Sequence, residues 1–320
     1  MSGIRILIGD CIEQLKALPD ESVHCCVTSP PYWALRDYGV EGQLGLEPTL
    51  AEHLAKLVEV FEHIKRVLRS DGTVWLNYGD SYAASVNGRS AADTKAAGND
   101  DRTFRDKPFS TIQGVLKPKD LCMIPSRLAI ALQEAGWWVR SEIVWEKPNP
   151  MPESCQDRPS QSYEKVFLLT KSSRYFYDAD AIREEHATPE GERGFKAGNS
   201  AMRGQEAIRK RGNLEASDNA AERYYHPNGR NARNVWRIST KAFRDAHFAT
   251  FPPELAERCI KAGCPEGGVV LDPFGGAGTT GLVADRLQRK AILIELNPEY
   301  AEMAKRRIEG DAPLFTEVAA

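Results

Sequence analysis

The sequence predicts an α/β protein built on a doubly wound, mostly parallel β-sheet. Short apolar runs of strand length alternate with segments whose apolar residues recur at the three- and four-residue spacing of a helix. A glycine-rich turn directly follows one of these runs, and an acidic residue ends the next run. With 320 residues the chain is long enough to bury one large core, or a core with an insert.

The expected strands and helices follow one another along most of the chain. Strands are expected at residues 4–9, 24–29, 73–78, 139–145, 165–170, 269–272 and 291–296. Helical periodicity covers residues 50–68, 126–136, 252–263 and 298–310, and Ser126 is a candidate N-cap for the second helix. Residues 83–119 and 183–235 interrupt the alternation with polar, glycine-containing sequence, which is typical of functional or disordered loops.

Composition and cysteine usage are those of a cytoplasmic globular protein. No apolar run reaches the roughly 18 residues of a membrane-spanning helix. The N-terminal segment lacks the basic and apolar regions of a signal peptide. Seven cysteines without a CxxC pair favour a reducing compartment, and we assign no metal ligands.

Positive charge is concentrated in one stretch, although the net charge of the chain is only −3. Between Arg193 and Arg244 there are twelve basic and four acidic residues, a local charge of +8 that leaves −11 for the remainder. A basic segment on an acidic body is typical of polyanion binding, and a solvated loop is the alternative interpretation.

Residues 269–287 are expected to form a strand, a glycine-rich turn and a helix. Gly276, Gly278 and Gly281 satisfy the pattern GxGxxG, and Glu295 ends the next strand 23 residues after Asp272. Such a turn lets a ligand approach the backbone, and the carboxylate can accept hydrogen bonds from ribose hydroxyls. This predicts an adenosine-containing cofactor; a turn needed only for packing is the alternative.

Residues 27–33, with the sequence VTSPPYW, end an apolar run with two prolines and two aromatic rings. Proline breaks helices and cannot donate a hydrogen bond within a sheet. The segment is therefore expected to be a rigid projection beyond a strand.

These two motifs, in this order, resemble those of the β-class DNA amino-methyltransferases. Thr-Ser-Pro-Pro-Tyr stands at 28–32 and Asp-Pro-Phe-Gly-Gly-Ala-Gly-Thr-Thr at 272–280. The resemblance extends over nearly the whole chain, with further recurrent family stretches at residues 8–23, 143–154, 163–178, 229–238 and 247–255.

The resemblance implies the fold of methyltransferases that use S-adenosyl-L-methionine (AdoMet), in permuted order. A catalytic half at 1–178, with the polar insert 83–119, precedes the AdoMet-binding half at 247–320. Between them lies an inserted, basic target-recognition region at 179–246.

Cofactor-binding roles follow from the same resemblance. The turn is expected to cradle the methionine half of AdoMet, Glu295 to hold the ribose hydroxyls, and Asp10 to accept from the adenine amino group. The stretch from 247 to 252 is expected to help hold the methionine carboxylate. The expected cofactor-binding residues are Asp10, Thr250, Phe251, Asp272, Pro273, Phe274, Gly275, Gly276, Gly278, Thr279, Thr280 and Glu295.

The expected catalytic residues are Ser29, Pro30, Pro31 and Tyr32. The amino group of a nucleobase is a poor nucleophile because its lone pair is delocalised into the ring. Hydrogen bonds to Ser29 Oγ and to the Pro30 carbonyl can aim that lone pair at the methyl group of AdoMet. The base must leave the duplex, and Tyr32 offers it a stacking face. Trp33 either joins this contact with DNA or anchors the loop in the core.

The identity of residue 29 bears on the choice of base. Family members that methylate adenine N6 usually carry Asp or Asn where this chain has Ser29, whereas members with Ser are mostly cytosine-N4 enzymes. We therefore favour cytosine N4, with adenine N6 as the alternative. Methylation of cytosine C5 requires a Pro-Cys pair by family pattern, and the chain has none.

Double-stranded DNA is the expected partner. Arginine and lysine neutralise phosphates, and some arginines read base edges in the major groove. The expected contacts are Trp33, Arg209, Lys210, Arg211, Arg230 and Arg233. A bacterial, archaeal or phage origin is expected, while a partner restriction endonuclease and the choice between monomer and homodimer stay open.

Two other classes of function are disfavoured. A DNA-binding protein that has lost catalysis would be free to lose the motifs at 29–32 and 276–280, and both are intact. Methylation of RNA or of a small molecule leaves the basic segment unexplained.

Overall fold

The computed structural model describes residues 3–85, 109–186, 228–241, 251–311 and 318–319. The chain divides into two compact units, one of residues 1–178 and 234–320 and one of residues 179–233. Residues 235–237 belong to the first unit because they pair with one of its strands. The bounds 179–246 of the target-recognition region stay a prediction.

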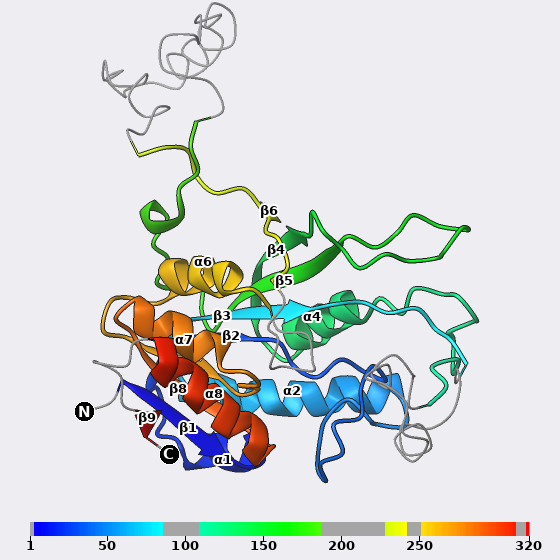
Figure 1. The fold of residues 1–320 in the computed structure, drawn as a ribbon, viewed down its shortest axis with the longest axis horizontal. Coiled ribbons are helices and arrows are strands. Elements are labelled where there is room, and N and C mark those ends of the chain that lie inside the picture. Colours follow the sequence, from blue (N-terminus) through cyan, green and yellow to red (C-terminus); the bar gives the residue numbers. More distant parts are fainter. Residues whose placement is uncertain (1–2, 86–108, 187–227, 242–250, 312–317, 320) are drawn as a thin grey trace, which may run out of the picture. The chain divides into compact units, whose positions relative to one another are not determined.

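A nine-stranded sheet forms the framework of the first unit, counted over the described residues (Figure 1). Its order is β6-β4-β5-β3-β2-β7-β8-β1-β9. Strand β5 is antiparallel to β3 and to β4, and the other neighbouring pairs are parallel. This confirms the predicted fold class. The strands are β1 (Ile4–Ile8), β2 (Val23–Thr28), β3 (Leu68–Tyr78), β4 (Trp138–Glu146), β5 (Tyr163–Thr170), β6 (Val235–Arg237), β7 (Val269–Asp272), β8 (Lys290–Glu295) and β9 (Val318–Ala319).

The strand order interleaves strands from the first and the last part of the sequence. Strand β7 lies between β2 and β8, and β8 lies between β7 and β1. Because these strands are parallel, the loops that follow β1, β2, β7 and β8 meet at one edge. Open α/β sheets bind ligands where the strand order reverses, at the carboxyl ends of the strands.

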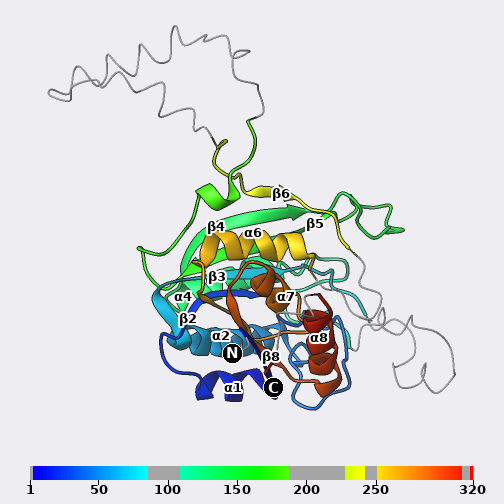
Figure 2. The same cartoon turned by 60° about the vertical axis from the view of Figure 1, so that its left-hand side comes forward.

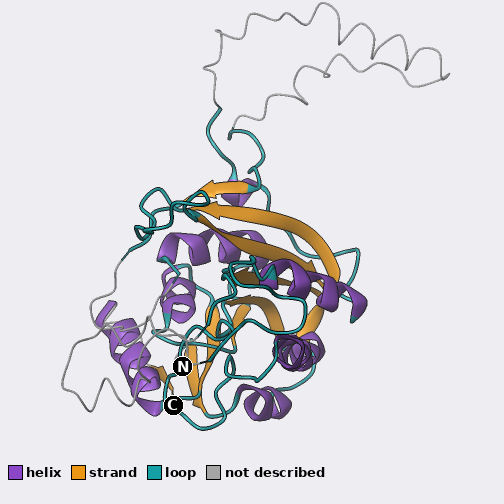
Figure 3. Ribbon diagram, turned by 90° about the vertical axis from the view of Figure 1, so that its right-hand side faces the viewer, coloured by secondary structure: helices purple, strands orange, loops and turns teal. Residues whose placement is uncertain are grey.

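Helices cover both faces of the sheet (Figures 2 and 3). One layer consists of α1 (Cys11–Ala17), α2 (Leu50–Val67) and α4 (Ile124–Glu134), with α2 in contact with the other two. The other consists of α6 (Pro253–Gly263), α7 (Thr279–Arg286) and α8 (Pro298–Asp311), with α7 in contact with the other two. The second unit contains a short 3-10 helix, η2 (Asp180–Ile182).

Helix α4 begins earlier than the sequence indicates, and the prediction that Ser126 is its N-cap is wrong. Met123 occupies the cap position with a φ of 57°, and Pro125 lies in the first turn. Proline suits this turn because it needs no backbone N–H and already has a helical φ. Ser126 instead uses its hydroxyl to accept a hydrogen bond of 2.9 Å from Lys165 Nζ.

The two described ends of the polar insert 83–119 are tied to each other by backbone hydrogen bonds. Lys119 N donates to Ala83 O over 2.8 Å and Thr111 N donates to Ala84 O over 3.0 Å. The middle of the insert lies outside the described residues. Among the described helices, none combines the length and apolarity required to span a membrane.

Candidate active site

The rigid segment expected at residues 29–33 directly follows β2, at the carboxyl edge of the sheet. Its shape is fixed by the buried hydroxyl of Tyr78 at the end of β3. This oxygen accepts from Trp33 N over 3.0 Å and donates to Pro31 O over 3.3 Å. It also lies 2.8 Å from Nε2 of buried His53, whose Nδ1 lies 2.7 Å from a Glu47 carboxylate oxygen. Side chains from β3 and α2 thus hold the loop on both sides of Tyr32.

Trp33 is a structural anchor in this arrangement. Its side chain is 1% exposed, and its Nε1 donates to Glu47 O over 3.0 Å. The predicted contact of Trp33 with DNA is therefore not supported, and the structure agrees with the alternative interpretation, an anchor in the core. A buried indole with its N–H paired contributes most by packing.

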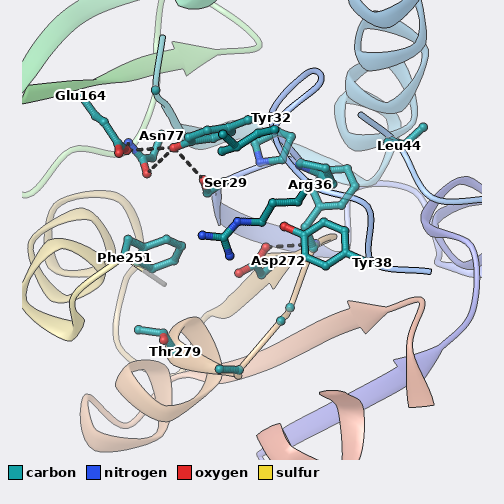
Figure 4. A pocket seen from close by; sticks show the side chains of 18 of the residues that line it. Ser29, Tyr32, Arg36, Tyr38, Leu44, Asn77, Glu164, Phe251, Asp272 and Thr279 are labelled. Carbon is teal, nitrogen blue, oxygen red and sulfur yellow. Dashed lines mark hydrogen bonds between the residues drawn. The ribbon is translucent and has the colours of Figure 1, made fainter. Parts of the chain in front are cut away.

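Tyr32 presents its ring to the site in a fixed orientation. It stacks on Tyr78 with ring centroids 4.5 Å apart and an angle of 28° between the planes. Its hydroxyl donates to Glu164 Oε2 on β5 over 2.8 Å, and Ser29 Oγ donates to that hydroxyl over 3.4 Å (Figure 4). Burial, and then the nearby Glu164 carboxylate, raise the pKa of Tyr32, so the phenol stays protonated.

The glycine-rich turn links β7 to α7 and is held by β8. Gly275 N donates to Ile294 O over 2.8 Å, and Gly276 N donates to Glu295 Oε2 over 2.8 Å. Gly278 caps α7 with a φ of 73°, a conformation that favours glycine. A Cβ at this position would lie 2.8 Å from that of Ala304, so the turn also packs tightly on α8.

Asp272 joins the two halves of the site. It is 1% exposed, and its Oδ1 accepts from Thr28 Oγ1 over 2.7 Å and from Phe274 N over 3.1 Å. Its Oδ2 accepts from Thr280 Oγ1 over 2.7 Å. Burial raises the pKa of Asp272 to about 7, because these three donors only partly offset the desolvation of a charged carboxylate. The side chain thus holds the end of β2 against the start of α7.

The loops after β1, β2, β7 and β8 enclose one cavity of about 970 Å³. This volume is at the upper end of the roughly 300–1,000 Å³ of small-molecule sites. The predicted residues that line it are Asp10, Ser29, Pro30, Pro31, Tyr32, Phe251, Asp272, Pro273, Phe274, Gly275, Gly276, Thr279 and Glu295. Gly278 and Thr280 are not among the lining residues; Gly278 caps α7, and Thr280 donates to Asp272. Thr250 lies outside the described residues.

The cofactor half of this cavity fits an adenosine-containing cation. Its walls combine the open backbone of the turn with Pro273, Phe274 and Phe251, while Asp10 and Glu295 supply carboxylates. Asp10 N-caps α1 through one oxygen, Oδ1, which accepts from Ile12 N and Glu13 N. Burial raises the pKa of Glu295. Its carboxylate also accepts hydrogen bonds from the backbone N–H groups of Gly276 and Asn297.

Several residues of the cavity were not found from the sequence. Figure 4 shows Arg36 reaching into the pocket between Ser29 and Asp272, with Tyr38 beside it. Asn77, Lys147 and Glu164 line the side next to Tyr32. The available signal was position. Asn77 is a polar residue near the end of the buried part of β3, and Glu164 lies two residues before the buried part of β5 begins.

The predicted DNA contacts divide into three groups. Arg209, Lys210 and Arg211 lie outside the described residues. Arg230 and Arg233 belong to the second unit, where Arg230 forms an ion pair of 3.2 Å with Glu184 and Arg233 N donates to the same carboxylate. Trp33 is buried, as described above.

Comparison with known proteins identifies the family. A family model described as DNA methylase, of the N6/N4 methyltransferases, matches residues 23–306. The type II methyltransferase M.Cfr9I of Citrobacter freundii is 44% identical over 320 residues, covering 100% of this chain and 92% of the relative. M.SmaI of Serratia marcescens, also a type II methyltransferase, is 42% identical and covers 96% of this chain and 91% of its own length.

Solved structures agree with this result. A protein of Thermus thermophilus described as a putative DNA modification methylase, in complex with AdoMet, is 25% identical with a TM-score of 0.55, covering 99% of both chains. The cytosine-N4-specific PvuII DNA methyltransferase shares the fold, with a TM-score of 0.62 at 19% identity over 99% of this chain and 96% of its own. The resemblance indicated by the two sequence motifs is thereby confirmed. The chain belongs to the DNA methylase family of N6/N4 methyltransferases and is a DNA methyltransferase that uses S-adenosyl-L-methionine.

Proposed function

We propose that this protein methylates the N4 amino group of cytosine in duplex DNA and that it is the modification enzyme of a type II restriction–modification system. The observation that carries the choice of base is the serine at position 29, which stands in the cavity at the carboxyl end of β2. The assignment to a restriction–modification system is supported by relatives at 42–44% identity that are named type II methyltransferases.

The cofactor half would hold AdoMet through the turn after β7, with Glu295 and Asp10 as acceptors for its ribose and adenine. When bound, AdoMet supplies an electrophilic methyl group on a sulfonium sulfur. The remaining chemistry depends on groups of the catalytic loop. A hydrogen bond from the target amino group to Ser29 Oγ, and a second to the Pro30 carbonyl, would turn the nitrogen lone pair toward the cofactor half.

The loop suits this task because it is already rigid. Tyr78 fixes the backbone at Pro31 and Trp33, so the acceptors do not need to be ordered when the base arrives. Tyr32 stacks on Tyr78 with one face, and its other face would receive the flipped base; both Ser29 and Tyr32 line the cavity. A serine hydroxyl is a weaker acceptor than a carboxylate, so it depends more on correct placement.

The product of the reaction tests this proposal. The protein is incubated with isotope-labelled AdoMet and unmethylated duplex DNA of mixed sequence, and the DNA is digested to nucleosides for mass spectrometry. N4-methyldeoxycytidine is the expected product. N6-methyldeoxyadenosine would overturn the choice of base, and protection of the DNA from a companion nuclease tests the assignment to a restriction–modification system.

A further inference from the structure

A chain of polar groups leads from Ser29 away from the cofactor half and ends at Glu164 on β5. Ser29 Oγ donates to the Tyr32 hydroxyl over 3.4 Å, and that hydroxyl donates to Glu164 Oε2 over 2.8 Å (Figure 4). We propose that Glu164 is the final proton acceptor of the methylation reaction and receives the amino proton through Ser29 and Tyr32. The proposal rests on the proposed methylation of an exocyclic amino group.

The donors around Glu164 set the direction of every hydrogen bond in this chain. Asn77 Nδ2 donates to Oε2 over 3.0 Å, and Lys147 Nζ forms an ion pair with Oε1. An ammonium and an amide N–H only donate, so both carboxylate oxygens are acceptors and Tyr32 must donate to Glu164. The Tyr32 oxygen then accepts the hydrogen bond from the Ser29 hydroxyl. The Ser29 oxygen therefore keeps its own lone pairs for the amino group of the base.

Glu164 lies in the cavity wall and forms an ion pair there with Lys147. Its side chain is 17% exposed and that of Lys147 is 19% exposed, so their attraction is only weakly screened. Lys147 also lies over the ring of Trp145, 4.6 Å from its centroid. Among the residues that the structure describes, the titratable groups in contact with Glu164 are Lys147 from the segment after β4 and Tyr32 from the loop after β2. The pKa of Tyr32 is raised, so its hydroxyl can relay a proton without remaining as a charged phenolate.

Gly79 provides an independent indication that this contact is built into the fold. A Cβ at Gly79 would lie 2.7 Å from Tyr32 Cε2 and 3.2 Å from Glu164 Cδ. Real Cβ atoms essentially never approach other atoms within 3.0 Å, so a side chain here would displace Tyr32. The glycine leaves the space in which the phenol and the carboxylate meet.

The proposed proton transfer balances the reaction. The carbon–nitrogen bond forms as the bond between the methyl carbon and the sulfonium sulfur breaks, and the sulfur keeps the electron pair. The amino nitrogen then carries a positive charge and releases one proton to Ser29 Oγ. Ser29 passes its own proton to Tyr32, and Tyr32 passes its proton to Glu164, which becomes a neutral acid. Glu164 later returns the proton to solvent through the cavity that it lines.

The test compares E164Q and Y32F with wild-type protein in single-turnover methylation. Tritiated AdoMet and unmethylated plasmid DNA of mixed sequence are used, with enzyme in excess over DNA. Glutamine keeps an acceptor for Tyr32 but cannot take a proton, and phenylalanine keeps the stacked ring but breaks the chain. Proton transfer contributes about 10²–10⁴-fold in enzymes, so each variant should be at least about 100-fold slower. AdoMet affinity, measured by calorimetry, should be unchanged.

The pH dependence separates proton transfer from a merely structural role. The wild-type rate should fall as the medium becomes acidic enough to protonate Glu164, and E164Q should lack this fall. E142Q removes a carboxylate of β4 that pairs with Lys165 outside the cavity, and it should keep the wild-type rate and profile. Because Ser29, Tyr32 and Glu164 act in series, the E164Q/Y32F double variant should be no slower than either single variant.

Three results would overturn the proposal. They are a wild-type rate in E164Q, an acidic fall that persists in E164Q, or a double variant whose defect is the product of the two single defects. The methylated nucleoside is identified in the same digests. An adenine product would overturn the proposed base alone, because the relay begins at any exocyclic amino group.

Discussion

At the scale of single residues, Ser29 is held mainly by the backbone on either side of it. Its hydroxyl makes one long hydrogen bond of 3.4 Å to Tyr32, while the loop that carries it is tied to Tyr78 at Pro31 and Trp33. The Ser29 side chain can therefore be changed without loss of the loop's shape. Its oxygen is expected to act on the base and not on the fold.

Ser29→Ala should lower the methyl-transfer rate by about 100–1,000-fold, because one positioned acceptor contributes roughly 2.7–4 kcal/mol to the transition state. AdoMet affinity and melting temperature should stay near those of the wild type. Single-turnover kinetics and isothermal calorimetry measure the two effects. A collapse of AdoMet binding would show that Ser29 belongs to the cofactor site.

Asp272 predicts an unusual dependence of stability on pH. Burial raises the pKa of this carboxyl to about 7 in the folded state, above the 3.8 of an ordinary aspartate. Between these two values the folded protein holds a proton that the unfolded chain has lost. The contribution of Asp272 to stability is therefore complete below about pH 4 and is lost as the pH rises toward 7, by about 4 kcal/mol in all.

Asp272→Asn removes this titration while keeping the shape of the side chain. The stability of wild-type protein relative to D272N should therefore decline as the pH rises from 5 to 8. Thr280 can accept from the new amide and turn its own proton to Val27 O, 3.3 Å away. Melting temperatures across this range provide the measurement, with Glu41→Gln on the exposed surface as control. Parallel curves for wild type and D272N would contradict the prediction.

At the scale of elements, the turn between β7 and α7 depends on close packing as well as on backbone conformation. Gly278 combines a φ of 73° with direct contact to α8 at Ala304. A non-glycine residue in this left-handed region costs about 1–2 kcal/mol before any clash is counted. The cofactor half is therefore sensitive to one added methyl group.

Gly278→Ala should weaken AdoMet binding at least tenfold and lower the melting temperature. Gly310→Ala is the matched control, because Gly310 lies in α8 with open space around its Cβ position. Alanine there should leave AdoMet affinity unchanged and stabilise the helix by up to about 1 kcal/mol. Calorimetric titration with AdoMet distinguishes the two variants, and equal affinities would show that the turn tolerates a side chain.

The individual strands and helices also show which parts of the fold can be predicted from sequence. Strands β2 and β8 each contain a short run of buried apolar residues, at 25–27 and 291–294, so their positions follow from composition. Helix α4 has Met123 at its N-cap and Pro125 in its first turn, and neither offers a side-chain cap that the sequence would reveal. The start of this helix was therefore predicted too late in the sequence. Strand β6 has three residues, too few for a periodicity to be detected.

The active site was predictable where it is local in sequence and not where it depends on tertiary structure. The segments around Ser29 and Gly276 are short motifs, and they were found. Glu164 lies 132 residues from Tyr32 and reaches it because β5 pairs antiparallel with β3. Trp33 was placed among the DNA contacts because exposure cannot be determined from an aromatic residue alone.

At the scale of the whole molecule, the chain separates an acidic body from a basic segment. Residues 193–244 carry a charge of +8 on a protein of net charge −3. Neutralising phosphates releases counterions from DNA, so these charges should make binding dependent on salt. The AdoMet site, assembled from the first unit, should not share this dependence.

Replacing Arg209, Lys210 and Arg211 by serine should weaken DNA binding and reduce the slope of log K against log salt by about 2–3. Serine at Lys16 and Lys56, on α1 and α2, is the control and should leave the slope unchanged. Fluorescence anisotropy with labelled duplex DNA at several salt concentrations measures the slope. An unchanged slope in the triple variant would exclude these three residues from the phosphate contacts.

The pairing of β1 with β8 also has a consequence for how the protein is made. Ile4 is paired with Ala291, so β1 leaves the ribosome long before its partner strand β8. At about 5–20 residues per second this delay is roughly 15–60 s, during which the apolar edge of β1 has no partner strand. The cofactor site can close only after β8 has been synthesised. A prematurely terminated product therefore has no cofactor site and cannot compete with the finished protein for AdoMet.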